Sequence, residues 1–138
     1  METAKMRIEY DSIGGKEIPA DAYYGVQSAR ALENFSITGA RLHPEMIRSL
    51  ARLKKACAMA NAAAGVIEYP VANAIADACD LILTGKFHDQ FIVDPVQGGA
   101  GTSTNMNANE VIANIAIELL GGTKGDYTLV PPNDHVNY

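Results

Sequence analysis

The sequence predicts a mostly α-helical fold with a short β ribbon near the N-terminus. Three segments place apolar residues at three- and four-residue spacing and are bounded by Pro or Gly, over about 44–65, 70–85 and 105–120. Before them, residues 6–10 alternate apolar and polar side chains, which is typical of a strand. With 138 residues and no internal repeat or linker, the chain is expected to form one domain, residues 1–138.

The ribbon is predicted from residues 6–10 and a return strand over 16–18. Gly14 and Gly15 between them indicate the turn, and Pro19 ends the second strand. Because two strands alone are marginally stable, we expect the ribbon to pack against the rest of the chain.

A short helix is expected next, over about residues 24–34, with Asp21 as its N-terminal cap. Residues 35–42, which include Gly39, are expected to connect it to the longer helices.

Each of the three longer helices has its own apolar pattern. The first begins at Pro44 and is predicted to bury a stripe of Met46, Leu50, Leu53, Cys57 and Ala60. The second begins near Pro70, ends at Gly85 and is predicted to bury Val71, Ile75, Cys79 and Ile82. The third, from about Asn105 to Leu120, is apolar on more than one face, so we expect other helices to cover it.

Composition narrows the classes of function. The formal net charge of −5 and the pI of about 5.1 argue against a nucleic-acid partner bound through bulk positive charge. No apolar run is long enough to span a bilayer, and residues 1–10 contain no signal-peptide core, so no membrane partner and a cytoplasmic location are expected.

The sequence contains no recognisable metal-binding motif, and its two cysteines are assigned no chemical role. Cys57 and Cys79 lack metal-type spacing and are interpreted as small buried hydrophobes, with a disulfide as the alternative. No other cluster of His, Cys, Asp or Glu has the spacing of metal ligands.

The most unusual segment is the glycine-rich stretch of residues 94–107, DPVQGGAGTSTNMN, which leads into the third long helix. Backbone N–H groups at a helix start favour anions, and the hydroxyl groups of Thr102, Ser103 and Thr104 can donate further hydrogen bonds. A ligand with a carboxylate would suit this place. Simple capping by Ser or Thr is the competing interpretation. A nucleotide loop fits poorly, because Gly101 stands where the Walker pattern requires Lys.

Four asparagines mark the third helix, although Asn is a poor helix former. We expect them to anchor neighbouring loops rather than to act in catalysis: Asn105, Asn107, Asn109 and Asn114.

The last eight residues, 131–138, are turn-like and rich in polar groups. His135 could serve as an acid or base, and a structural role is the alternative. His43 and His88 show no partners in the sequence and are assigned no chemical role.

Several of these segments resemble the aspartase/fumarase superfamily, in the order in which that superfamily has them. The matching segments are residues 19–30 (PADAYYGVQSAR), 33–35 (ENF), 97–114 and 132–137 (PNDHVN). The resemblance covers nearly the whole chain. It implies the helical N-terminal domain of that superfamily, with the central helical-bundle and C-terminal domains absent from these residues.

Three positions are more similar to the aspartase branch than to the fumarase branch. Tyr24 precedes Gly25 where fumarases more often have Trp, Ala100 stands where they tend to have Ser, and Pro131 stands where they usually have His. A fumarase remains the alternative among enzymes, and a helical interaction module without chemistry is the alternative outside them.

The aspartase resemblance implies reversible elimination of ammonia from L-aspartate to give fumarate, without an organic cofactor; it leaves open a divalent metal as activator. It places Thr102 and Ser103 in the substrate pocket. It assigns a supporting role to Thr104, Asn105, Asn133, Asp134 and His135.

The resemblance also implies what these residues lack. The catalytic base and the remaining pocket residues of the family lie beyond Tyr138, so no catalytic residue is assigned here. Family members are homotetramers whose active sites combine several subunits, and we therefore expect the 138-residue chain alone to be inactive.

Overall fold

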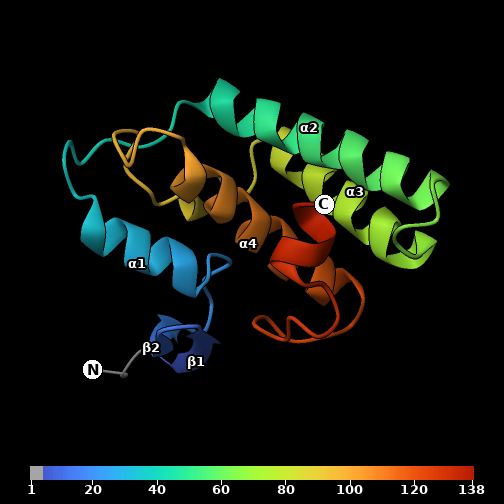
Figure 1. Cartoon of the computed structure of the whole chain (residues 1–138), viewed down its shortest axis with the longest axis horizontal. Helices are drawn as coiled ribbons and strands as arrows, with labels where there is room; N and C mark the ends of the chain where they lie inside the picture. The colour runs from blue at the N-terminus through green and yellow to red at the C-terminus, as the bar shows by residue number, and fades with distance from the viewer. Residues whose placement is uncertain (1–4) are drawn as a thin grey trace.

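The structure is a computed structural model that describes residues 5–138, so the first four residues of the segment expected to lack a signal-peptide core lie outside it. It confirms a mostly α-helical fold with a small antiparallel ribbon (Figure 1). The elements in order are β1 (Met6–Asp11), β2 (Gly14–Pro19), α1 (Val26–Asn34), α2 (Pro44–Ala63), α3 (Tyr69–Leu83), η1 (His88–Gln90), α4 (Thr102–Leu119) and η2 (Pro132–Val136).

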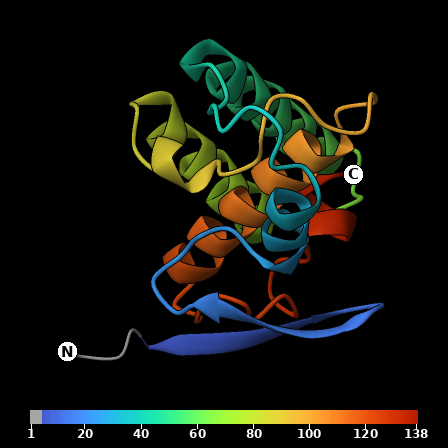
Figure 2. The same ribbon diagram turned by 90° about the vertical axis from the view of Figure 1, so that its left-hand side faces the viewer.

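Helix α4 is the centre of the fold. It contacts α1, α2, α3 and η2, and these four elements surround it in both views (Figures 1 and 2). Every residue from 107 to 117 is buried, including the asparagines and Glu110. This confirms the prediction of a covered helix, which begins at Thr102, three residues before the predicted start at Asn105.

The β ribbon lies below the helices (Figure 2) and forms where predicted, but its turn does not. Asp11 pairs with Gly14, so the turn residues are Ser12 and Ile13, and the two glycines belong to β2. The Asp11 carboxylate accepts a hydrogen bond of 3.0 Å from the Ile13 N–H, which stabilises this turn without glycine in it.

Helix α1 corrects the predicted cap. Its first residue, Val26, follows Gly25, which has no side chain to cap the helix. Asp21 is exposed and makes no cap hydrogen bond to α1. Two carboxylates from distant elements take that place instead. Glu9 accepts from the Val26 N–H at 2.9 Å, and Glu110 accepts from the Gly25 N–H at 2.9 Å.

Glu110 extends this cap to the first turn of α1. It accepts hydrogen bonds from the Gln27 N–H at 2.8 Å and from both the N–H and the hydroxyl of Ser28. Burial raises the pKa of Glu110, and the hydrogen bonds from Ser28, Gln27 and Gly25 oppose that shift. A Cβ on Gly25 would lie 2.6 Å from the Glu9 carboxylate and 2.9 Å from that of Glu110, so only glycine fits there.

The predicted stripe of α2 is wrong in phase. The helix buries Ile47, Ala51, Lys54, Ala58 and Ala62, whereas Met46 is 51% exposed and Leu53 is 57% exposed. Helix α2 packs on α3, which also buries several alanines, and small side chains let two helices approach closely. Helix α2 therefore buries the face that carries most of its small alanines, and the face with Met46 and Leu53 is exposed.

The predicted core of α3 is confirmed for Ile75, Cys79 and Ile82, which are fully buried, and Val71 is half-buried. Both cysteines are free thiols, so the disulfide alternative is wrong. Cys57 is half-buried rather than buried as predicted, because it lies beside the buried face of α2. Burial raises the pKa of the Cys79 thiol to about 12, so it is an unreactive core residue. Among residues 5–138, no helix has both the length and the apolar character needed to cross a membrane.

Candidate functional site

The glycine-rich loop before α4 is fixed at its first residue. Asp94 is only 3% exposed, and its carboxylate accepts hydrogen bonds from the N–H groups of Thr38 at 2.6 Å, Val96 at 2.8 Å and Gly39 at 2.9 Å. Burial alone would raise the pKa of Asp94, but the hydrogen bonds from Val96 and Thr38 lower it to about 2. The connection after α1 and the loop before α4 are thus joined through one ionised carboxylate.

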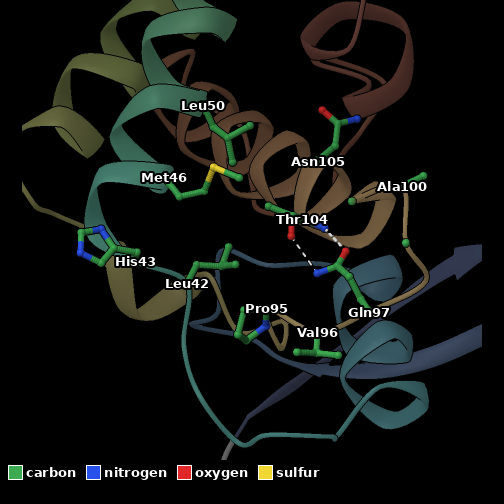
Figure 3. Close-up of a pocket in the computed structure, with 12 residues that line it drawn as sticks. Leu42, His43, Met46, Leu50, Pro95, Val96, Gln97, Ala100, Thr104 and Asn105 are labelled. Atoms are coloured by element: carbon green, nitrogen blue, oxygen red, sulfur yellow. Dashed lines mark hydrogen bonds between the residues drawn. The ribbon is translucent and has the colours of Figure 1, made fainter.

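The helix start is held by a glutamine rather than by a hydroxyl residue. Gly101 precedes α4 in the left-handed conformation, with φ of +73°, and offers no side-chain cap. The Gln97 amide oxygen accepts a hydrogen bond of 2.8 Å from the Thr104 N–H, and its nitrogen donates to the Thr104 hydroxyl at 2.8 Å (Figure 3). The predicted alternative of capping by Ser or Thr is therefore wrong.

Thr102 and Ser103 take no part in capping the helix. Thr102 is exposed and Ser103 is half-buried. Neither their N–H groups nor their hydroxyls form a hydrogen bond with any residue in the described part of the chain. Both line a hollow of about 240 Å³ whose other walls include Gln27 and Arg30 of α1 and Asp11. The Asp11 carboxylate accepts a hydrogen bond of 2.8 Å from the Arg30 Nε. The four donors at this helix start are suited to a negatively charged ligand.

A larger cavity of about 720 Å³ lies beside the helix start (Figure 3). Leu42, Met46 and Leu50 form its apolar side, the loop of residues 95–101 faces them, and Thr104 and Asn105 also line it. His43, at its edge, uses its Nδ1 to accept a hydrogen bond of 3.2 Å from the Glu45 N–H and so caps α2. The exposed apolar residues of α2 thus border the predicted site.

Asn105 belongs to a polar cluster that the sequence did not reveal. The Asn137 side-chain oxygen accepts hydrogen bonds from the Asn105 amide at 2.8 Å and from the Lys54 ammonium at 3.0 Å. Lys54 is 7% exposed, and burial lowers its pKa. Lys54 lies on the buried face of α2, which the predicted stripe did not identify.

The C-terminal segment approaches α4 but does not share one cavity with Thr102. Residues 132–136 form a single π-helical turn rather than a loop. Asn133 and Asp134 are exposed, and Asn133 lines a third hollow together with Gln27 and Glu110. His135 is half-buried, and its buried Nδ1 has no hydrogen-bond partner among residues 5–138.

Two of the four asparagines are confirmed as loop anchors. Asn107 accepts from the Ile92 N–H at 2.8 Å and donates to the Gln90 carbonyl at 3.0 Å. Asn114 donates to the Tyr23 carbonyl at 2.8 Å and accepts from the Gly125 N–H at 2.7 Å.

Asn109 and His88 are the other polar residues considered in the sequence. Asn109 is fully buried, and its side-chain oxygen has no partner within the described residues. His88, for which no partner was expected, makes a 2.9 Å hydrogen bond between Nε2 and the Ile82 carbonyl. No group of three or more His, Cys, Asp or Glu side chains in residues 5–138 is arranged to hold a metal ion.

Comparison with known proteins identifies the relatives of this chain. A family model described as "Lyase" matches residues 14–138. Aspartate ammonia-lyase of a Bacillus species is 60% identical over 132 residues, which are 96% of this chain and 28% of that protein. Aspartate ammonia-lyase of Helicobacter pylori is 58% identical over 134 residues, and that of Escherichia coli is 56% identical over 135 residues.

Solved structures agree with the sequence relatives. The native form of the fumarate lyase:delta crystallin from Brucella melitensis is 52% identical, with a TM-score of 0.94 over 96% of this chain and 31% of that one. A recombinant class II fumarase from Schistosoma mansoni is 38% identical, with a TM-score of 0.91 over 96% of this chain and 28% of its own.

The chain spans less than a third of the length of these relatives and corresponds to their N-terminal part. The resemblance seen in the sequence motifs is confirmed by the family model and by relatives that cover nearly all 138 residues. The chain therefore belongs to the lyase family that aspartate ammonia-lyases and fumarases share.

Proposed function

We propose that this chain is the N-terminal domain of an aspartate ammonia-lyase, with the central helical-bundle and C-terminal domains outside residues 1–138. The whole enzyme would reversibly eliminate ammonia from L-aspartate to give fumarate. The observation that carries the proposal is the start of α4, where Thr102 and Ser103 keep their N–H and hydroxyl donors available beside the Arg30 hollow. The identity of 56–60% to aspartate ammonia-lyases supports it.

The reaction explains why donors are needed at this point. A base removes a proton from the carbon next to a carboxylate, and the electron pair of that C–H bond is delocalised into the carboxylate as a dianionic enediolate. The electron pair then forms the double bond of fumarate while the C–N bond breaks and nitrogen leaves with its electron pair as ammonia. Hydrogen-bond donors directed at the enediolate lower the barrier.

Each candidate residue then has a role. Thr102 and Ser103 donate to a substrate carboxylate, and Thr104 supports them from the first helical turn. Asn105 is positioned through its hydrogen bond to Asn137. Asn133, Asp134 and His135 form the rim that leads to the pocket. The catalytic base comes from outside this chain.

The proposal includes the setting of the enzyme. The whole protein would be a cytoplasmic homotetramer with active sites shared between subunits, binding a small-molecule substrate and neither nucleic acid nor membrane. It would use no organic cofactor, with a divalent metal left open as an activator. The 138-residue chain alone would release no ammonia from L-aspartate.

A fumarase is the second candidate, supported by the 38% identical class II fumarase structure. It is less favoured because Tyr24, Ala100 and Pro131 match the aspartase branch. Absorbance of fumarate, with L-aspartate in one cuvette and L-malate in the other, separates the two in the full-length lyase that carries this chain. Fumarate from malate alone would overturn the aspartase assignment.

The test of the site is Thr102→Ala in that full-length lyase. Because one donor to a developing anion is lost, we expect kcat/KM for L-aspartate to fall at least about tenfold. Thr123→Ala, at an exposed threonine beyond the C-terminal end of α4, is the matched control and should leave kcat/KM unchanged. Equal activity of the two variants would favour a helical module without chemistry.

A further inference from the structure

We propose that Gln97 is a positioning residue, which holds the start of α4 so that Thr102 and Ser103 do not have to cap it. The inference rests on the proposed function for its consequence in catalysis. Its structural part concerns only contacts within this chain.

The Gln97 side chain accepts the hydrogen bond that a capping hydroxyl residue would otherwise accept. In most helices a Ser, Thr, Asp or Asn before the first turn accepts from the N–H two or three residues later. Here Gly101 occupies that position and has no side chain, and the Gln97 oxygen accepts from the Thr104 N–H at 2.8 Å. The helix therefore has its cap without using Thr102 or Ser103.

Both the oxygen and the nitrogen of the Gln97 amide form hydrogen bonds. Its nitrogen donates to the Thr104 hydroxyl at 2.8 Å and to the Asp94 carbonyl at 2.8 Å. The Asp94 carboxylate in turn accepts from the N–H groups of residues 37–39. A continuous set of contacts thus runs from the connection after α1, through Asp94 and Gln97, to the first turn of α4.

Removal of the Gln97 amide creates a competition for Thr102. The Thr104 N–H would lose its partner, and the first turn of α4 would be free to unwind by one residue. Thr102 would then occupy the cap position, where its hydroxyl accepts from a backbone N–H instead of donating to a substrate carboxylate. The expected defect is therefore in the orientation of Thr102, with little change in overall stability.

The structural part is tested by hydrogen exchange of individual amides in the 138-residue chain. Gln97→Met keeps the length of the side chain and removes its polar atoms, so we expect exchange at the Thr104 amide to accelerate about tenfold or more. Gln97→Glu keeps an acceptor for that amide and should retain most of the protection. Unchanged exchange at Thr104 in Gln97→Met would overturn the inference.

The functional part is tested in the full-length lyase. We expect Gln97→Met to lower kcat/KM for L-aspartate about tenfold, and to add little to Thr102→Ala in the double variant. Thr104→Val removes the hydroxyl that Gln97 contacts and should lower kcat/KM, whereas Thr104→Ser keeps it and should restore the activity. Ser28→Ala, which removes a buried hydrogen bond at α1, is a stability control and should lower the Tm without this defect in kcat/KM.

The outcomes separate the two proposals. If Thr102→Ala lowers kcat/KM and Gln97→Met does not, the positioning role is wrong and the proposed function stands. Independent, multiplicative losses in the double variant would also overturn the positioning role. If Thr102→Ala has no effect, the proposed function fails, and accelerated exchange at Thr104 in Gln97→Met would still establish the structural part.

Discussion

Asp94 shows how one buried carboxylate fixes a functional loop. It accepts from the N–H groups of two separate segments, and these hydrogen bonds lower its pKa from 3.8 to about 2 despite its burial. A depressed carboxyl pKa stabilises the folded chain at pH values above the pKa of the unfolded state. This contribution should be lost as the pH falls from about 4 to about 2.

Asp94→Asn tests this dependence. We expect the variant to be less stable than the parent chain at pH 7, and the difference to shrink as the pH falls through this range, as measured by urea denaturation at several pH values. Asp77→Asn, at an exposed position on α3, is the control and should follow the parent chain. A constant difference between Asp94→Asn and the parent from pH 7 to pH 2 would contradict the assignment.

Single residues also show what a sequence can predict at this scale. The roles of Asn107 and Asn114 followed from chemistry, because a buried amide must find partners. The roles of Glu9, Gln97 and Glu110 did not follow, because each carboxylate or amide satisfies groups on another segment. Nothing local in the sequence marks such a partner.

At the scale of the element, α2 shows that the spacing of apolar residues can locate a helix without identifying its buried face. Ile47 is 2% exposed and Leu53 is 57% exposed, although both are large apolar residues of α2. Ile47→Ala should therefore lower the free energy of unfolding by about 2–4 kcal/mol. Leu53→Ala, the matched control, should change it by less than about 0.5 kcal/mol. Urea denaturation measures both, and a larger loss for Leu53→Ala would restore the predicted stripe.

The error in α2 has a physical cause. Periodicity locates a helix well, and the bounds of α2, α3 and the end of α4 are close to those predicted. Which face is buried depends on the neighbouring element, and α3 presents a surface that accepts alanines. Met46 and Leu50 line the cavity beside the glycine-rich loop, and Leu50 also packs against the core. Part of the predicted stripe therefore borders the site.

At the scale of the whole molecule, polar contacts attach the peripheral segments to α4. The ribbon buries Ile18 completely, whereas Ile8 is 59% exposed and Tyr10 is 74% exposed. Glu9 also joins the ribbon to the α1 cap and to the Tyr127 hydroxyl, which donates to Glu9 at 3.1 Å. Burial and the nearby carboxylates of Glu110 and Glu9 raise the pKa of Tyr127, so this hydroxyl remains a donor at neutral pH.

Asn114 is the residue of α4 on which this attachment depends most directly. It is fully buried and binds the Tyr23 carbonyl, the Gly125 N–H and the Tyr127 hydroxyl, which belong to segments on either side of it in the sequence. Asn114→Ala would leave the first two groups without partners. The expected loss in the free energy of unfolding is about 2–4 kcal/mol, because each buried unsatisfied group costs about 1–3 kcal/mol.

The same substitution tests whether the peripheral segments fold together with the helical core. Tyrosine fluorescence reports on the six tyrosines, of which Tyr10, Tyr23, Tyr24 and Tyr127 lie in the peripheral segments. Far-ultraviolet circular dichroism reports on the helices. Because Asn114 lies on the central helix, we expect both signals in Asn114→Ala to change in one urea transition at a lower midpoint than in the parent chain. Asn73→Ala, at an exposed asparagine of α3, should leave the midpoint unchanged. If fluorescence changed well before circular dichroism, α4 would be a core to which the ribbon and the 123–127 segment attach independently, rather than the centre of one cooperative unit.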